Sequence, residues 1–195
     1  MCTTASLDGS TRSPGESEGS RSSDLRSELA PTRATSPCEL RALEPADAAA
    51  IWRCARASKI LDVNSPYAYL LLCSDFADAG IVAEQENEVL GFVVGYRPPP
   101  RPETLFVWQV AVAEARRGEG LAGRMLDAIL ARHLAAGGRY VEATVTPSNR
   151  ASAALFTGFA ERHQAQLVES PAFARELFPG GDHEDETRLR MGPFA

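Results

Sequence analysis

The sequence predicts an α/β (α+β) domain built on a mixed central sheet with helices on both faces. Segments with the two-residue period of strands and segments with the 3.6-residue period of helices follow one another along residues 38–195. One strand-like segment, residues 104–112, is apolar on both faces and therefore belongs in the middle of the sheet. Strands and helices in this order favour a three-layer domain.

The first part of the domain is predicted to contain one strand and two helices. Residues 38–43 alternate apolar and polar side chains, as an edge or half-buried strand does. Residues 44–58 follow with helical spacing, and Pro45 lies where a helix starts. The pair Ser65–Pro66 supplies an N-cap and a first helical residue for a second helix over 65–77.

The later elements alternate between strands and helices. The polar turn QENE at residues 85–88 separates two strands, and Gly137–Gly138 provides a helix stop. Ser148 or Asn149 caps the last helix. The predicted strands are 79–84, 89–97, 104–112, 139–146 and 187–192, and the predicted helices are 120–136 and 148–163.

Residues 1–37 differ in composition from the rest of the chain. They are rich in Ser, Thr, Gly and Pro and contain few large apolar side chains. Such a segment cannot bury enough apolar surface to offset the entropy lost on ordering. We therefore expect a disordered N-terminal leader over 1–37 and a folded domain over 38–195.

The composition excludes several classes of function. The chain of 195 residues has 20 basic and 26 acidic residues and a net charge of −6, whereas proteins that bind nucleic acid or anionic membranes favour basic surfaces. The longest apolar run, around Tyr69–Cys73, is too short to span a bilayer, and no signal peptide is evident. We expect a cytoplasmic protein that binds neither nucleic acid nor membrane.

No metal site is expected. The four cysteines form no C-x-x-C pair, and free thiols in a reducing compartment explain them. The segment DHEDE at residues 182–186 lacks the second histidine of the H-E-x-x-H pattern.

A basic, glycine-rich turn follows the central strand and opens a helix within Val110–Leu130. Gly118 and Gly120 allow backbone N–H groups to approach a ligand, and Arg116, Arg117 and the helix N-terminus add positive charge. These features suit a pyrophosphate, but a strand–helix turn with solvated arginines has the same composition. Both interpretations remain open on the residues of the turn alone.

The turn resembles the pyrophosphate loop of the GNAT superfamily of N-acetyltransferases, because the Arg/Gln-x-x-Gly-x-Gly/Ala motif falls on Arg117, Gly120 and Ala122. The segment VTPSNRASAALF resembles the second signature of that family, where Asn149 would contact coenzyme A. The resemblance implies a GNAT acyltransferase fold, acetyl-CoA as co-substrate, and a splayed strand over Trp108–Ala113. The implied cofactor-binding residues are Val110, Val112, Arg117, Gly118, Gly120, Ala122 and Asn149.

One position departs from the family pattern. Many GNAT enzymes carry a tyrosine after the last helix's leucine, where it protonates the departing thiolate, and this chain has Phe156. A phenyl ring cannot donate a proton. Either another group is the acid, or the thiolate takes the proton of the amine by way of water.

The remaining polar segments resemble those of L-2,4-diaminobutyrate acetyltransferases, the enzymes of ectoine biosynthesis. The matching strings are LDVNSPYAYLLLCSDFAD, GFVVGYRPPPRPETLFVWQVAV, YVEATVTPSNRASAALF and HEDE with the later LR, and they span nearly all of residues 38–195. The resemblance implies acetyl transfer to the γ-amino group of a small diamino acid by a homodimeric enzyme. The implied substrate-binding residues are Asp62, Tyr67, Trp108, His183 and Glu186.

Each implied residue also has a purely structural interpretation. Asp62 or Asn64 could cap the helix that starts at Ser65–Pro66, and Tyr67 and Tyr69 could be core residues with one satisfied hydroxyl. Trp108 could simply pack in a central strand, and DHEDE could be a solvated acidic loop. Asn64 is most simply a turn residue. The segment RPPPRPE, residues 97–103, contains a P-x-x-P pattern that an SH3-like partner could bind, but a stiff hairpin connection near the mouth of a pocket is the favoured interpretation.

The resemblance implies direct transfer between two bound substrates. The γ-ammonium must first lose a proton, and Glu186 and His183 are the candidate bases, with Asp62 as a further candidate. A backbone N–H near Val110 would stabilise the oxyanion. Cys73 lies in too apolar a context to be a nucleophile.

Two other functions fit the same sequence. Another GNAT acetyltransferase could act on ornithine, lysine, a polyamine or a protein N-terminus, because the superfamily does not fix the acceptor. A non-catalytic acyl-CoA-binding module is the second possibility, which Phe156 keeps open.

Overall fold

The computed structural model describes residues 37–59, 61–180 and 183–195. The predicted leader over 1–37 lies outside these residues except for Pro37. The folded part is a seven-stranded mixed sheet in the order β1-β2-β3-β4-β5-β7-β6. Its strands are β1 Glu39–Arg41, β2 Ile81–Gln85, β3 Glu88–Tyr96, β4 Thr104–Val112, β5 Tyr140–Val145, β6 Leu167–Phe173 and β7 Glu186–Met191.

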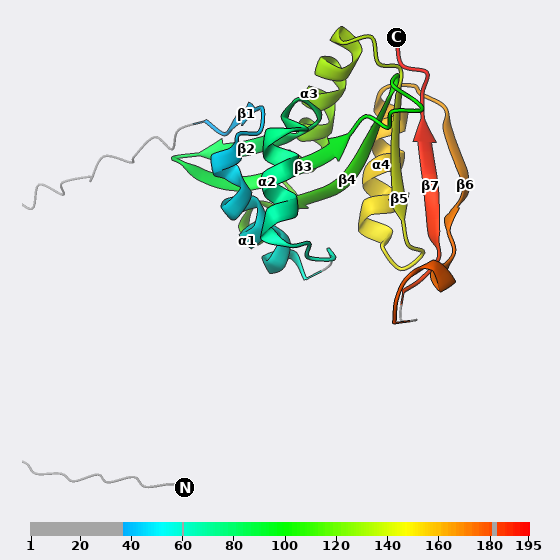
Figure 1. Cartoon of the computed structure of the whole chain (residues 1–195). Helices are drawn as coiled ribbons and strands as arrows, with labels where there is room; N and C mark the ends of the chain where they lie inside the picture. The colour runs from blue at the N-terminus through cyan, green and yellow to red at the C-terminus, as the bar shows by residue number, and fades with distance from the viewer. Residues whose placement is uncertain (1–36, 60, 181–182) are drawn as a thin grey trace, which may run out of the picture. The chain divides into compact units, whose positions relative to one another are not determined.

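In the described part of the chain, four α-helices cover the two faces of the sheet (Figure 1). They are α1 Ala48–Ser58, α2 Pro66–Ser74, α3 Leu121–Ala135 and α4 Arg150–Arg162. Side chains of β3 point alternately to the two faces: Phe92 and Val94 pack with α1 and α2, whereas Val93 packs with α3 and α4. The predicted class, a mixed sheet with helices on both faces, is therefore confirmed, and β4 is the central strand.

Local signals in the sequence fix several element ends. Ser65 Oγ accepts a hydrogen bond from the Ala68 N–H at 3.2 Å, so Ser65 is the N-cap of α2. Asn149 Oδ1 accepts from the Ser152 N–H at 3.1 Å and caps α4. The turn between β2 and β3 places Glu86 and Asn87 at positive φ, as a two-residue hairpin turn requires.

Strand β6 was not predicted. It lies at the edge of the sheet, pairs with β7 alone, contains Pro171, and leaves most of its side chains exposed. Edge strands tolerate proline and charge because one side of their backbone has no partner strand. The segment therefore lacks the apolar pattern by which a strand is recognised in a sequence.

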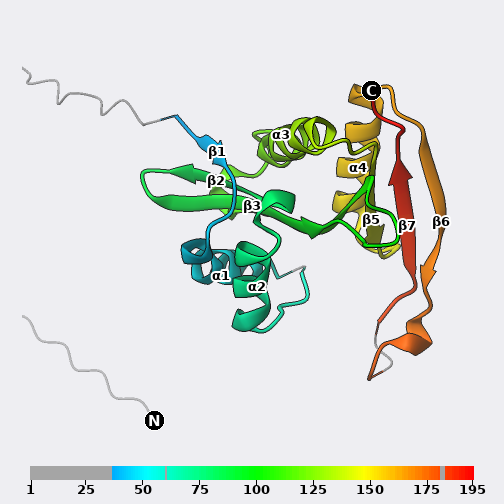
Figure 2. The same cartoon turned by 45° about the horizontal axis from the view of Figure 1, so that its top comes forward.

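Among the described strands, β4 and β5 are the one parallel pair of neighbours, and they pair over three positions. The register is Thr104↔Tyr140, Leu105↔Val141 and Phe106↔Glu142. Beyond these pairs the strands separate, as Figures 1 and 2 show, and β4 stays with β3 while β5 stays with β7. The middle of the sheet is thus open along residues 107–112 of β4.

Asp47 ties the start of the domain to the sheet. Its carboxylate accepts two hydrogen bonds of 2.8 Å from Arg41, which also binds Glu84 of β2, and one of 2.8 Å from the Glu44 N–H. Burial alone would raise the pKa of Asp47, but these hydrogen bonds lower it below the usual range of an aspartate. The ionised form of Asp47 therefore stabilises the folded state.

We predict that Asp47→Asn lowers the free energy of unfolding at pH 7 by about 1–3 kcal/mol, measured by urea denaturation. Because the folded-state pKa is lowered, this stabilisation is complete above the unfolded pKa of about 3.9 and disappears as pH falls through the folded-state value. Asp75→Asn is the control, because the Asp75 carboxylate is exposed and accepts a hydrogen bond from the neighbouring Ser74 hydroxyl. Its free energy of unfolding should change by no more than about 0.5 kcal/mol. A constant difference between wild type and Asp47→Asn down to pH 2 would contradict the assignment.

Candidate active site

Two adjoining cavities occupy the opening between β4 and β5. The first, of about 520 Å³, is lined by acidic, basic and aromatic side chains and is called the polar cavity here. The second, of about 630 Å³, is lined mainly by Val, Ala and Leu and is called the apolar groove. Leu61, Val110, Asn149 and Ser152 line both. Molecules bound in the two spaces would therefore meet at Val110.

The backbone of β4 presents hydrogen-bonding groups to this junction. The Ala113 N–H donates to Leu90 O, and the pairs Ala111↔Phe92 and Val110↔Val93 follow in register. Hydrogen-bonded and non-hydrogen-bonded pairs alternate in an antiparallel ladder. The N–H groups of Val110 and Val112 therefore point away from β3, toward the opening.

The glycine-rich turn lies at the end of the apolar groove. Gly118 and Gly120 have φ values of 82° and 72°, which favour glycine, and a Cβ at either position would meet no described residue within 4 Å beyond its chain neighbours. Gly120 directly precedes α3, so free N–H groups of the first helical turn lie at this position. Arg117 and Ala122 line the groove, whereas Arg116 binds Glu119 at 2.8 Å. This end suits a phosphorylated group.

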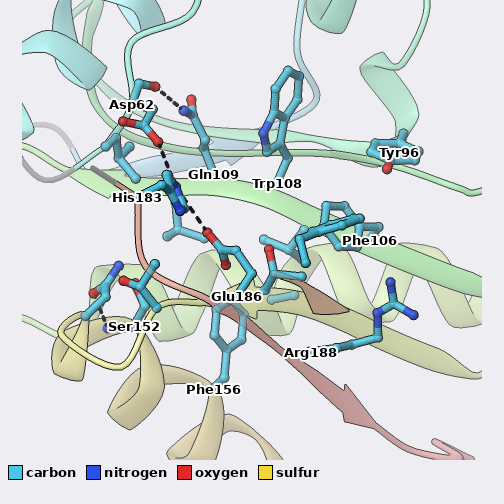
Figure 3. Close-up of a pocket in the computed structure, with 18 of the residues that line it drawn as sticks. Asp62, Tyr96, Phe106, Trp108, Gln109, Ser152, Phe156, His183, Glu186 and Arg188 are labelled. Carbon is cyan, nitrogen blue, oxygen red and sulfur yellow. Dashed lines mark hydrogen bonds and ion pairs between the residues drawn. The ribbon is translucent and has the colours of Figure 1, made fainter. Parts of the chain in front are cut away.

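Three titratable side chains gather at one end of the polar cavity (Figure 3). His183 Nε2 lies 3.7 Å from Asp62 Oδ2 and 3.7 Å from Glu186 Oε1. His183 Nδ1 lies 2.6 Å from Glu184 O, which assigns the N–H to Nδ1 and leaves Nε2 facing the carboxylates. The imidazole also stacks on Phe178, with ring centroids 3.7 Å apart. These contacts fix the ring between the two acids.

Buried hydrogen bonds hold the segment that carries Asp62. The Tyr69 hydroxyl donates to Gln109 Oε1 at 2.9 Å, and Gln109 Nε2 donates to the Asp62 carbonyl oxygen at 2.7 Å. Tyr69 and Gln109 are both buried. The backbone of Asp62 is thus anchored to β4, while its carboxylate is left exposed to the cavity.

A β-bulge aims Trp108 at the same cavity. Val94 pairs with Gln109 and Gly95 pairs with Val107, so Trp108 has no partner on β3. An extra residue of this kind changes the direction of the side chains that follow it. Trp108 is 43% exposed although its strand is central, and it lines the polar cavity.

The structure brings most of the predicted residues together. Asp62, Trp108, His183 and Glu186 line the polar cavity, and Val110, Val112, Arg117, Ala122 and Asn149 line the apolar groove. Tyr67 lies on the first turn of α2, is 67% exposed, and is not part of the lining of either cavity. The helix cap is Ser65, so neither Asp62 nor Asn64 is needed for that purpose, and Asn64 also lines the polar cavity.

The opposite end of the polar cavity is basic and was not predicted. Arg101, from the loop after β3, and Arg188 of β7 line it, and both lie near the buried carboxylate of Glu142. The place of Arg101 agrees with a proline-rich connection near the pocket mouth. In the last strand, charged side chains stand at every second position, namely Glu186, Arg188 and Arg190. This pattern could have indicated a charged cavity wall, because alternate residues share one face of a strand.

Within the described residues, no cluster of three His, Cys, Asp or Glu side chains could hold a metal ion. No described helix is long and apolar enough to cross a bilayer. The described cysteines Cys38, Cys54 and Cys73 are free thiols, and none of them lines either cavity. Burial raises the pKa of the Cys73 thiol to about 11, and the nearby charge of Asp47 adds to the rise.

Comparisons with known proteins identify the family of the chain. The profile of the Acetyltransferase (GNAT) family matches residues 48–159. The L-2,4-diaminobutyric acid acetyltransferase of Streptomyces anulatus is 53% identical over 151 residues, which cover 76% of this chain and 86% of that protein. The corresponding protein of Marinococcus halophilus is 43% identical over 149 residues, covering 76% and 86%.

Solved structures show the same relationship. The diaminobutyrate acetyltransferase EctA from Paenibacillus lautus, in complex with L-2,4-diaminobutyric acid and coenzyme A, superposes with a TM-score of 0.78 at 41% identity, covering 82% of this chain and 96% of that chain. Ard1 from Thermoplasma volcanium, at 17% identity and a TM-score of 0.67, shares the fold alone. The chain therefore belongs to the acetyltransferase (GNAT) family, among its L-2,4-diaminobutyric acid acetyltransferases.

Proposed function

We propose that this chain transfers the acetyl group of acetyl-CoA to the γ-amino group of L-2,4-diaminobutyrate, giving N4-acetyl-L-2,4-diaminobutyrate and CoA in ectoine biosynthesis. The observation that carries the proposal is the junction of the two cavities, because Val110, Asn149 and Ser152 line both. The apolar groove suits a pantetheine arm, and the polar cavity offers both acids and arginines to a diamino acid. L-2,4-diaminobutyric acid, the substrate named for the Paenibacillus lautus protein, has the amino groups and the carboxylate that these acids and arginines complement.

The residues of the groove fit acetyl-CoA as the co-substrate. The Val112 N–H, which points away from β3, would bond an amide carbonyl of pantetheine, and this leaves the Val110 N–H for the thioester. Arg117, Ala122 and the N–H groups that follow Gly118 and Gly120 would hold the pyrophosphate at the start of α3. Asn149, oriented by its hydrogen bond from Ser152, lies at the junction and would contact the same arm.

Proton removal from the γ-ammonium is assigned to the acidic end of the polar cavity. An alkyl amine has a pKa of about 10, so it arrives protonated and cannot attack until it loses a proton. Glu186 is the first candidate base, because its Oε2 is buried and has no hydrogen-bond partner among the described residues. His183 is the second, and the exposed carboxylate of Asp62 orients the ammonium groups. Trp108 forms the opposite wall, and Tyr67 remains a prediction.

The junction also provides groups for the thioester. The Val110 N–H is placed to donate to the oxygen of the reacting carbonyl, where negative charge develops. Phe156 lines the polar cavity but has no proton to give. Ser152, one helical turn earlier on α4, lines both cavities, and this supports assigning to its hydroxyl a hydrogen bond to the departing thiolate.

Transfer proceeds directly between the two bound substrates. A covalent acyl-enzyme would need a nucleophile at the junction, and the described cysteines lie elsewhere. Cys73, with its pKa raised to about 11 and its side chain buried, stays a thiol at neutral pH.

The functional unit is proposed to be a cytoplasmic homodimer. A set of large apolar side chains is exposed around α2, namely Tyr67, Leu70, Leu71 and Phe76. An exposed apolar patch of this kind is typical of an interface between proteins. Sedimentation velocity of the full chain is the test, and a monomer at micromolar concentration would remove the dimer from the proposal.

Product NMR after incubation with acetyl-CoA and L-2,4-diaminobutyrate tests the proposed activity. We expect acetylation of the γ-nitrogen only, because the acids and arginines orient the acceptor. L-Ornithine and putrescine are the matched competitors, and both should react at least about tenfold more slowly, since they misplace the nitrogen or lack the carboxylate. Equal rates with all three would sink the diaminobutyrate assignment, and CoA binding without any product would indicate a non-catalytic module.

Glu186→Gln tests the assignment of the base. The variant keeps the size of the side chain but cannot accept the proton, so we expect kcat to fall by about 10²–10³-fold while KM for acetyl-CoA stays unchanged. Glu176→Gln, at an exposed acid outside both cavities, is the control and should keep wild-type rates. A kcat within threefold of wild type in Glu186→Gln would transfer the role to His183 or Asp62.

A further inference from the structure

We propose that Arg101 and Arg188 bind the α-carboxylate of the acceptor and that the buried carboxylate of Glu142 positions both guanidinium groups. The inference rests on the proposed function and adds to it the residues that distinguish an amino acid from a simple diamine. These residues belong to the basic end of the polar cavity, away from the acids that handle the amine.

Glu142 is the centre of the cluster. Its side chain, on β5, is 2% exposed. Its Oε2 accepts a hydrogen bond of 3.0 Å from Arg101 Nη2 and lies 3.8 Å from Arg188 Nε, and its Oε1 binds Arg190. One buried carboxylate thus holds three guanidinium groups at the same place.

The charges of this cluster do not balance. Besides Glu142, the acid that pairs with an arginine of the cluster is Glu103, whose carboxylate lies 4.0 Å from Arg190. Arg190 does not line the polar cavity, and its guanidinium lies 3.8 Å from the centre of the Tyr140 ring. Arg101 and Arg188 do line the cavity. Positive charge is therefore left in excess on the two arginines that face the ligand.

Both arginines also have unused donors. The Nε atoms of Arg101 and Arg188 are buried and have no hydrogen-bond partner in the described part of the chain. Buried donors of charged groups are rarely left unbonded, since the lost hydration is not replaced. These Nε atoms are closed to a ligand, so a substrate carboxylate would bond the Nη groups of the same side chains, which are 37% exposed in Arg101 and 30% exposed in Arg188. Guanidinium groups match the planar geometry of a carboxylate.

The spacing of the two ends of the cavity fits one small diamino acid. Glu186 and Arg188 are two residues apart on β7, so their side chains share one face with Cα atoms about 7 Å apart. Figure 3 shows both residues on the β7 side of the cavity, across from Trp108. In diaminobutyrate four bonds of about 1.5 Å separate the carboxylate carbon from the γ-nitrogen, a span of about 5 Å. One molecule can therefore contact the arginines and the base at the same time.

The test compares diaminobutyrate with 1,3-diaminopropane, which is the same molecule without the carboxylate. For wild type we expect kcat/KM for diaminobutyrate to exceed that for 1,3-diaminopropane by at least about 100-fold. Arg188→Met should lower kcat/KM for diaminobutyrate by about 10–100-fold and leave the value for 1,3-diaminopropane within threefold, since a charge-assisted hydrogen bond is lost with one substrate only. The ratio of the two values is independent of the fraction of protein that is folded.

Three further variants complete the experiment. Arg101→Met should also lower the ratio of kcat/KM for diaminobutyrate to kcat/KM for 1,3-diaminopropane. This variant keeps the test available if Arg188→Met does not fold. Glu142→Gln should raise KM for diaminobutyrate more than KM for 1,3-diaminopropane, because Glu142 acts through the arginines, and so it should also lower the ratio. Arg175→Met removes an exposed arginine outside the cavity and should keep the wild-type ratio.

The outcomes separate this inference from the proposed function. If wild type does not acetylate diaminobutyrate, the proposed function fails and the inference fails with it. If wild type acetylates diaminobutyrate but Arg188→Met and Arg101→Met keep the wild-type ratio, the function stands and the carboxylate assignment is overturned. An equal loss with both substrates in these variants would likewise overturn it, since that result indicates a structural role.

Discussion

The short pairing between β4 and β5 is the constraint on which the site depends. These strands are parallel neighbours over only three positions and then separate. Parallel pairing leaves no gap for a ligand, whereas separation exposes the N–H groups of Val110 and Val112 at the centre of the sheet. A buried, unbonded backbone group is costly, so this opening is favourable chiefly when another molecule supplies the missing hydrogen bonds.

The separation also brings charge into the interior. Strand β7 carries Glu186 and Arg188 on one face, and β5 carries Glu142 opposite Arg190. A carboxylate and a guanidinium group two residues apart on one strand give a cavity with a negative and a positive end. A diamino acid, with ammonium groups and a carboxylate, has the complementary pattern. Electrostatic complementarity of this kind fixes the orientation of a ligand more than its affinity.

The fold could be predicted from the sequence to the extent that its elements carry local signals. Ser65, Asn149 and the apolar pattern of β4 marked helix starts and the central strand, because caps and burial depend on nearby residues. Strand β6 could not be predicted, since an edge strand is defined by its partner β7 and not by its own pattern. The bulge at Trp108 is likewise a property of the β3–β4 register, and it explains how a central strand presents an exposed tryptophan.

The candidate site likewise contains residues that could be predicted from the sequence and residues that could not. Asp62, His183 and Glu186 were predicted by family resemblance, and their proximity depends on loops far apart in the sequence. Tyr67 was implied by the same resemblance, yet the tyrosine whose hydroxyl supports Asp62 is Tyr69, two positions later on the buried face of α2. Arg101 and Arg188 were missed because a buried glutamate far from both in the sequence, Glu142, brings them together, and the alternation of charges in β7 shows a shared face but not this partner.

The most direct test of two joined cavities is the affinity of a bisubstrate compound that links the γ-nitrogen of diaminobutyrate to the sulfur of CoA through an acetyl bridge. Such a compound would occupy the groove and the polar cavity together and pass Val110 at their junction. Isothermal titration calorimetry should show binding to wild type at least about 100-fold tighter than that of CoA. Binding no tighter than that of CoA would show that the two cavities do not present their ligands to each other.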